Sequence, residues 1–118
     1  MTKVDIEGEK LVVHLEGLEE IEAIKKELEI PLNCIEKAAY VKDLDEEEKR
    51  KIRPKLRVGG TYISKDIYGR FITGFGLAFF ATKDLENSLA IFVDCGFEYK
   101  VVIIEVQNPE ILEKIKGK

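Results

Sequence analysis

The chain has 118 residues, of which 45% are hydrophobic and 36% charged, and its formal net charge is −4. This length and this balance predict one ordinary globular domain over residues 1–118 and exclude a disordered chain. The acidic net charge disfavours a nucleic-acid partner, and no apolar run reaches the roughly 20 residues that a transmembrane segment needs. Residues 1–10 lack the apolar core of a signal peptide, which predicts a cytoplasmic protein.

The N-terminal third contains two strand patterns separated by a helix pattern. An aliphatic run predicts a strand over residues 10–16, and Gly17 ends it. Residues 18–28 carry apolar side chains at helical spacing within a charged segment, which predicts an amphipathic helix. These apolar residues are Leu18, Ile21, Ile24 and Leu28. Pro31 then returns the chain to an extended form, and residues 32–41 predict a second, long strand.

Charge dominates residues 43–53, and acid–base pairs at i,i+4 spacing favour one solvated helical turn that Pro54 ends. The expected pairs are Glu46 with Arg50 and Glu47 with Lys51. The basic side chains form the candidate ligand-binding residues: Lys49, Arg50, Lys51, Arg53, Lys55 and Arg57, with Arg70 as a further member. This cluster has two interpretations, a site for an acidic partner, a phosphate or an anionic lipid, and a solvated face neutralised by the acidic residues just upstream.

Five further strand patterns follow along the chain. They cover residues 56–63, 68–73, 75–82, 89–94 and 99–106. Gly59 and Gly60 predict a bulge or sharp bend in the first of them. Gly74 and Gly76 flank the turn of a hairpin, and Phe75 between them is expected at an exposed tip, while the other phenylalanines are expected mainly in the core. The last two patterns predict an antiparallel pair joined by a short turn.

The end of the chain predicts a short helix that covers the strands. The strand over residues 99–106 is apolar on both faces, which is typical of a strand covered on both sides. Asn108 is a favourable N-cap, and Pro109 suits the first helical position. The apolar stripe of this helix consists of Ile111, Leu112 and Ile115. We expect this stripe to dock on the strands and to be hidden from water.

Three stretches of the chain resemble the pleckstrin-homology (PH) superfold, and more narrowly a group of small bacterial single-domain PH-like proteins. They are residues 11–18 continuing to 30–32, residues 60–63 with 69–71, and residues 89–93, 99–106 and 108–110. The resemblance implies a mainly β fold, a bent antiparallel barrel of about seven strands with a C-terminal capping helix. The amphipathic helix between strands 1 and 2 is extra. It replaces the basic loop of phosphoinositide-binding members, so that headgroup site does not carry over.

Few residues of the chain suggest catalysis or metal binding. The single histidine, His14, lies within the first predicted strand and is interpreted as a structural residue, exposed or hydrogen-bonded. Cys34 and Cys95 lack metal-ligand spacing and are interpreted as buried free thiols. Asp94 is expected to form a turn, and the glycine spacings match no phosphate-binding loop. The sequence therefore predicts no catalytic residue, no metal site and no cofactor.

Two functional hypotheses follow for a chain of this kind. The first is a non-enzymatic interaction module that binds a protein partner or itself, because an open barrel leaves strand edges that pairing across a symmetry axis would satisfy. The alternative is binding of a small anionic ligand or a phospholipid headgroup through the basic segment 49–57. The net charge of −4 makes an anionic lipid the less favoured partner.

Overall fold

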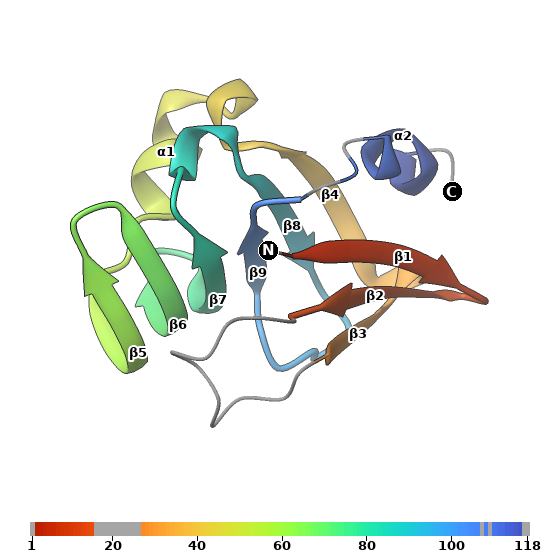
Figure 1. Ribbon diagram of the computed structural model, residues 1–118, viewed down its shortest axis with the longest axis horizontal. Helices are drawn as coiled ribbons and strands as arrows, with labels where there is room; N and C mark the ends of the chain where they lie inside the picture. The colour runs from red at the N-terminus through yellow and green to blue at the C-terminus, as the bar shows by residue number, and fades with distance from the viewer. Residues whose placement is uncertain (1, 16–26, 107, 109, 117–118) are drawn as a thin grey trace.

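The computed structural model describes residues 2–15, 27–106, 108 and 110–116. In these ranges the chain forms a three-stranded sheet, a six-stranded sheet and two short α-helices (Figure 1). The strands are β1 (Lys3–Glu7), β2 (Lys10–His14), β3 (Glu27–Pro31), β4 (Ile35–Tyr40), β5 (Leu56–Ile63), β6 (Asp66–Thr73), β7 (Gly76–Thr82), β8 (Leu89–Val93) and β9 (Val101–Ile104). The α-helices are α1 (Glu46–Lys51) and α2 (Ile111–Lys116), and the 3-10 helices are η2 (Leu32–Cys34), η3 (Val41–Asp43) and η4 (Leu85–Asn87). The predicted mainly β class is confirmed.

The three-stranded sheet has the order β1-β2-β3 and is antiparallel throughout. Only its middle strand was predicted from the sequence. Most of the predicted helix over residues 18–28 lies outside the described residues, but its last two residues, Glu27 and Leu28, belong to β3, so the predicted helix end is wrong. Leu28 and Ile30 are buried and Glu27 and Glu29 exposed, so this strand alternates with the period of two that half-buried strands have.

The six-stranded sheet has the order β4-β8-β9-β7-β6-β5. Its pairs are antiparallel except for β7 with β9, which are parallel, with Phe80 opposite Ile103. The predicted hairpin of β6 with β7 and the predicted antiparallel pair of β8 with β9 are both confirmed. The parallel pair and the linear order, with β4 and β5 as edges, differ from the all-antiparallel barrel that the PH resemblance implies, and that barrel is not confirmed.

The predicted strand over residues 32–41 is wrong at both ends. The chain forms the short helix η2 before β4 and η3 after it, so only residues 35–40 are extended. Cys34 and Val41 are buried in these two turns, and each turn changes the chain direction at an end of the sheet. An apolar run can therefore serve turns that enter the core as well as a strand, and periodicity alone does not separate the two.

The central strand β9 has a hydrophobic cluster on each face. Val102 and Ile104 belong to the cluster shared with the three-stranded sheet and α2, whereas Val101 and Ile103 belong to the cluster shared with η3 and with Ile52 after α1. All four side chains are fully buried. The six-stranded sheet is thus the middle layer of the molecule, and the predicted coverage of this strand on both faces is confirmed.

The predicted C-terminal helix is α2, and its apolar stripe is buried, with exposed fractions of 2% for Ile111, 8% for Leu112 and 8% for Ile115. Figure 1 shows α2 beside β4, near the outer end of β1. The Asn108 side chain has a different role from the expected N-cap, since its Nδ2 donates to Val4 O at 2.7 Å and its Oδ1 accepts from Val4 N at 3.4 Å. These bonds join the start of α2 to β1.

Both described α-helices have 6 residues. Within the part of the chain that the structure describes, no helix has the length and apolar character needed to cross a lipid bilayer.

Candidate functional site

The outer edge of the six-stranded sheet is formed by β5, which pairs with β6 alone among the described strands. In the described part of the chain, the exposed large hydrophobic side chains all lie on this strand. Their exposed fractions are 64% for Leu56, 47% for Val58, 47% for Tyr62 and 68% for Ile63. Only Tyr62 has a ring contact that the structure records, edge-on to Phe71 at a centroid distance of 6.0 Å. An apolar strand at a sheet edge is a candidate interaction surface.

A pair of facing glycines allows β5 and β6 to approach closely. Gly60 lies opposite Gly69, and their φ angles of +125° and +127° fall in the region that favours glycine. A Cβ atom on Gly60 would collide with the carbonyl oxygen of Tyr68, and one on Gly69 with that of Gly59. The register also shifts between Arg57 and Gly59. The bulge or bend predicted here is therefore confirmed.

This bulge determines which side chains of β5 share a face of the sheet. Leu56 and Ile63 would lie on opposite faces of a regular strand, because the difference between their residue numbers is odd. Their partners on β6, Ile72 and Asp66, differ by an even number, so Leu56 and Ile63 project from the same face. Arg57 and Tyr62 share the other face for the same reason. The strand therefore has one apolar pair on one face and a cation with an aromatic ring on the other.

The first three residues of the predicted basic cluster, Lys49, Arg50 and Lys51, lie on α1, which is the predicted helical turn. A capping box starts this helix, in which Asp45 Oδ1 accepts from Glu48 N at 2.7 Å and Glu48 Oε1 accepts from Asp45 N at 3.2 Å. The expected i,i+4 ion pairs are wrong, because the helix pairs its side chains at i,i+3. The observed pairs are Lys49 Nζ with Glu46 Oε2 at 3.7 Å and Arg50 Nη2 with Glu47 Oε2 at 3.9 Å.

Lys51, the last residue of α1, has its ammonium group 4.6 Å from the centroid of the Phe75 ring. The basic side chains of α1 thus contact groups close to them, as the neutralised-face interpretation expects. Arg53, Lys55 and Arg57 are instead exposed; the first two lie just before β5 and Arg57 lies on it. Of these three, Arg57 donates from Nη1 to Gly60 O at 3.2 Å, a bond within its own strand. The exposed half of the cluster therefore adjoins the apolar edge strand.

The remaining candidate, Arg70, lies on β6 opposite Gly59, but its guanidinium group is hydrogen-bonded to the phenol of Tyr99. The Tyr99 side chain is buried, with 2% of its surface exposed. Burial raises the pKa of Tyr99 above its ordinary value, the neighbouring Glu98 carboxylate raises it further, and Arg70 opposes both. The structure therefore gives Arg70 a buried structural partner, in contrast to the exposed Arg53 and Arg57.

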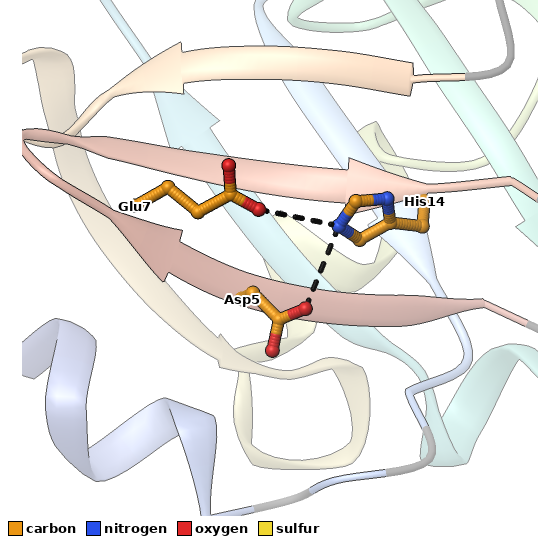
Figure 2. Close-up of side chains that lie close together, drawn as sticks. All are labelled: Asp5, Glu7 and His14. Atoms are coloured by element: carbon orange, nitrogen blue, oxygen red, sulfur yellow. Dashed lines mark ion pairs between the residues drawn. The ribbon is translucent and has the colours of Figure 1, made fainter.

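His14 lies at the end of β2 among three carboxylates on the outer face of the small sheet. Its Nε2 atom is 3.5 Å from Asp5 Oδ2 and 3.6 Å from Glu7 Oε2, both on β1 (Figure 2). Its Nδ1 atom is 3.1 Å from Glu27 Oε2 on β3. His14 thus lies within ion-pair distance of three carboxylates, with 23% of its side chain exposed, and these partners all come from strands that the sequence did not reveal.

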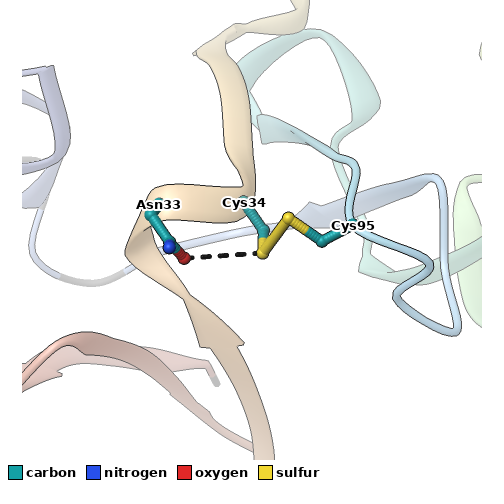
Figure 3. The surroundings of a disulfide bond; sticks show 3 residues. All are labelled: Asn33, Cys34 and Cys95. Atoms are coloured by element: carbon teal, nitrogen blue, oxygen red, sulfur yellow. Dashed lines mark hydrogen bonds between the residues drawn. A yellow bond between two sulfur atoms is a disulfide. The ribbon is translucent and has the colours of Figure 1, made fainter.

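Cys34 and Cys95 form a disulfide, so the expectation of two buried free thiols is wrong (Figure 3). Their Cα atoms are 5.5 Å apart, within the range that a disulfide spans. Cys34 lies in η2 at the start of β4, and Cys95 is exposed in the β8–β9 connection. The two segments are close because β4 pairs with β8, which a sequence separation of 61 residues conceals.

Two predictions for loop residues have different outcomes. Phe75 lies in the β6–β7 turn as expected, but its predicted exposure is wrong, because its ring packs on that of Phe92 at a centroid distance of 5.2 Å and is only partly exposed. Asp94 forms a turn as expected, its carbonyl oxygen accepting from Phe97 N at 3.3 Å. The intervening Cys95 and Gly96 have φ angles of 64° and 72°, which make this a tight reversal.

The sequence patterns indicated neither the carboxylate cluster around His14 nor the exposed apolar side chains of β5. The first required recognition of β1, whose alternation over residues 3–7 is short and mixed with charge. The second had a weak signal, since the pattern of Val58, Tyr62 and Ile63 predicts a strand but does not show that this strand is a sheet edge.

Comparisons with protein-family models, with curated proteins and with solved structures find no match to this chain. No relative therefore supplies a role for any of these residues.

Proposed function

We propose that the chain is a non-enzymatic interaction module of PH-like fold whose partner is a second copy of itself, bound through β5. The observation that carries this proposal is the gathering of four exposed large hydrophobic side chains on one edge strand. An edge strand presents unpaired N–H and C=O groups, and a second strand added to it satisfies them while covering its apolar side chains.

Among the described strands, the other sheet edges expose charged side chains but no large hydrophobic ones, and this protects an edge strand from pairing with another chain. The edge strand β4 exposes Glu36 and Lys37 and has a register shift between Ile35 and Lys37. Both edges of the small sheet also expose charged side chains: Lys3 and Glu7 on β1, Glu27 and Glu29 on β3. Charges and bulges without exposed apolar side chains are the usual protection of an edge strand. The β5 edge has a bulge but exposes apolar side chains beside it.

Antiparallel pairing of two β5 strands about a two-fold axis makes this edge complementary to itself. An axis at Gly60, with Val58 left out of the pairing as it is against β6, places Leu56 of one copy opposite Ile63 of the other. It also places Arg57 opposite Tyr62, a cation beside an aromatic ring. Both pairings keep each residue on the face that the bulge gives it. The same axis separates the two copies of Arg57 by several residues along the strands, which limits their repulsion.

Sedimentation velocity across a range of protein concentrations tests this proposal. One pair of edge strands covers less area than a standard interface, so we expect a monomer–dimer equilibrium with a dissociation constant in the micromolar range. The double variant Leu56→Glu/Ile63→Glu should raise that constant at least about tenfold, because it places carboxylates opposite each other across the axis. Both side chains are exposed, so the monomer should keep its circular dichroism spectrum.

The matched control is Lys42→Glu, which changes the net charge by the same amount at an exposed position on η3. It should dimerise like the parent chain. A parent chain that sediments as a monomer at every concentration contradicts the proposal, and so does a double variant that dimerises as the parent does.

A second candidate function is the binding of an anionic ligand or phospholipid headgroup through segment 49–57. It is favoured by one observation: in the described part of the chain, the exposed Arg53 and Lys55 form no ion pair. Under this hypothesis the parent chain co-sediments with anionic liposomes and the charge reversal Arg53→Glu/Arg57→Glu abolishes this. The control reversal Lys42→Glu/Lys83→Glu, at exposed positions elsewhere, should bind like the parent chain. No co-sedimentation by the parent chain eliminates the candidate.

We also propose a cytoplasmic location, as predicted from the sequence. The Cys34–Cys95 disulfide provides the test, because disulfides persist in oxidising compartments and are rare in the cytosol. Alkylation of thiols in intact cells, followed by mass spectrometry, should find a substantial reduced fraction if the location is cytoplasmic. A fully oxidised pair in those cells contradicts the proposed location.

A further inference from the structure

Three atoms that can accept a hydrogen bond or bind a cation converge on the outer face of the small sheet. They are His14 Nε2, Asp5 Oδ2 and Glu7 Oε2, and they all lie within 4.8 Å of one another. The β1–β2 pairing places Asp5 and Glu7 on the strand beside His14, and Figure 2 shows the two carboxylates directed at the same ring nitrogen. This arrangement depends on two strands and could not arise from one short sequence motif.

On the other side of the His14 ring, a third carboxylate lies near Nδ1, while Nε2 faces Asp5 and Glu7. Glu27 Oε2 is 3.1 Å from Nδ1, within ion-pair distance. In a neutral ring that carries its proton on Nδ1, the nitrogen nearer Glu27, the Nε2 lone pair is directed at Asp5 and Glu7. A histidine whose other N–H group donates to a carboxylate is the arrangement that metal-binding histidines commonly have. Glu27 would then act as a positioning residue for the ring.

The spacing of the three acceptor atoms matches the size of a small cation. A tetrahedral zinc site with bonds of about 2.0 Å separates neighbouring donor atoms by about 3.3 Å. The two distances from Nε2, 3.5 Å to Asp5 and 3.6 Å to Glu7, are close to that separation. One imidazole with two carboxylates is a donor set suited to zinc and neighbouring divalent transition metals, whereas calcium and magnesium prefer oxygen donors alone.

Two lysines on the same face of the sheet, Lys3 and Lys10, could lower the affinity of this site for a cation through their positive charge. Lys10 is engaged elsewhere, with its ammonium group 2.9 Å from Glu29. Lys3 is exposed and lies opposite His14 in register, where its charge weakens the binding of a cation. Asp5 and Glu7 also remain 41% and 60% exposed, so solvent can fill the remaining coordination positions. Moderate rather than tight affinity is therefore expected.

We propose that Asp5, Glu7 and His14 form a binding site for one divalent transition-metal ion, with Zn²⁺ as the best fit, and that Glu27 positions the His14 ring. The site lies on the three-stranded sheet and is independent of β5, so its test does not depend on self-association. It also differs from the sequence-based prediction, which found no metal site because it considered one histidine and two distant cysteines.

Zinc titration of the full chain at neutral pH, read by competition with a chromophoric chelator, measures the affinity and the stoichiometry. We expect one zinc ion per chain. His14→Gln should reduce the affinity at least about tenfold, Asp5→Asn and Glu7→Gln should each weaken it, and Glu27→Gln should weaken it about tenfold. The matched control is Glu36→Gln, which removes the same charge at an exposed position on β4 of the other sheet and should leave the affinity nearly unchanged.

The ring itself can be observed directly, since the chain has 1 histidine. Long-range nitrogen–proton NMR should show the His14 Nε2 signal shifting as zinc is added, with Nδ1 remaining protonated. Zinc that leaves the Nε2 signal unchanged, or that binds His14→Gln as tightly as the parent chain, overturns the proposal. An imidazolium ring with both nitrogens protonated that zinc does not displace overturns it as well, because a proton then occupies the position assigned to the metal.

Discussion

Tyr99 gives the clearest pH-dependent behaviour that a single residue of this structure predicts. Burial and the Glu98 carboxylate hold its pKa above the ordinary tyrosine value in the folded chain. In the unfolded chain the phenol titrates near its ordinary value of about 10. Above that pH the unfolded state loses the Tyr99 proton first, so unfolding releases a proton and a rise in pH favours it. The stabilisation is complete below about pH 10 and is lost as the pH rises through the folded-state pKa.

The variant Tyr99→Phe removes this titration. Its free energy of unfolding at neutral pH should fall by about 1 kcal/mol, because Arg70 loses a hydrogen-bond partner. Above about pH 10, however, its free energy of unfolding should decline less steeply than that of the parent chain. Denaturant unfolding at several pH values measures both effects. Parallel pH profiles for the two chains would show that the Tyr99 pKa is not raised by folding.

At the residue scale, the sequence predicts local conformation better than it predicts partners. The bend at Gly59 and the turn at Asp94 were correct because both depend on a few adjacent residues. The state of Cys34 was wrong, and the surroundings of His14 were not predicted. Both depend on strands that pair only in the folded chain, across sequence separations that no local pattern records.

Among the elements, α2 is the one whose packing was predicted best from the sequence, because its apolar stripe of Ile111, Leu112 and Ile115 is buried as expected. Replacing Ile111 by aspartate places a charge at a position that is 2% exposed. We expect the free energy of unfolding to fall by about 3 kcal/mol or more, since an apolar contact is lost and a buried carboxylate has no partner. Glu113→Gln on the exposed side of the same helix is the control and should change it little. Equal stability of the two variants in thermal unfolding would mean that α2 is not docked.

The edge strands show why the sheet arrangement was only partly predictable. Seven of the described strands correspond to predicted patterns, and the β6–β7 hairpin was correct because adjacent strands are joined by a short turn. The parallel pair of β7 with β9 has no local signal, since β8 lies between them in the sequence. β5 is an edge because it pairs with β6 alone among the described strands. Nothing within residues 56–63 indicates that a second partner strand is missing, and so the exposure of Leu56 and Ile63 could not be predicted from their own segment.

At the scale of the whole molecule, the disulfide joins the start of β4 to the β8–β9 connection across 61 residues. In the chain-entropy model a loop of this length stabilises the folded state by up to about 4 kcal/mol. A reducing agent, or the variant Cys34→Ser/Cys95→Ser, should therefore lower the free energy of unfolding by about 2–4 kcal/mol in guanidinium chloride. The variant should not respond to the reducing agent. A parent chain with two titratable thiols and no response to reductant would contradict the disulfide.

The two layers on either side of the six-stranded sheet leave β5 at the periphery of the molecule, and this position is the basis of the proposed self-association. Figure 1 shows β5 at the side of the molecule remote from α2 and the small sheet. The remaining surface of the sheet is covered, since the two hydrophobic clusters include side chains from both of its neighbouring layers. The strand edge at β5 is thus the part of the sheet that a second copy can extend.

Hydrogen exchange of the backbone amides at low and at high protein concentration tests this account most directly. Pairing of two β5 strands should protect amides in residues 56–63 that do not bond to β6, and only at concentrations at which the dimer forms. The amides of β4, the other edge of the same sheet, should exchange at the same rate at both concentrations. Exchange of residues 56–63 that is independent of concentration, or protection that arises at β4 instead, would contradict it.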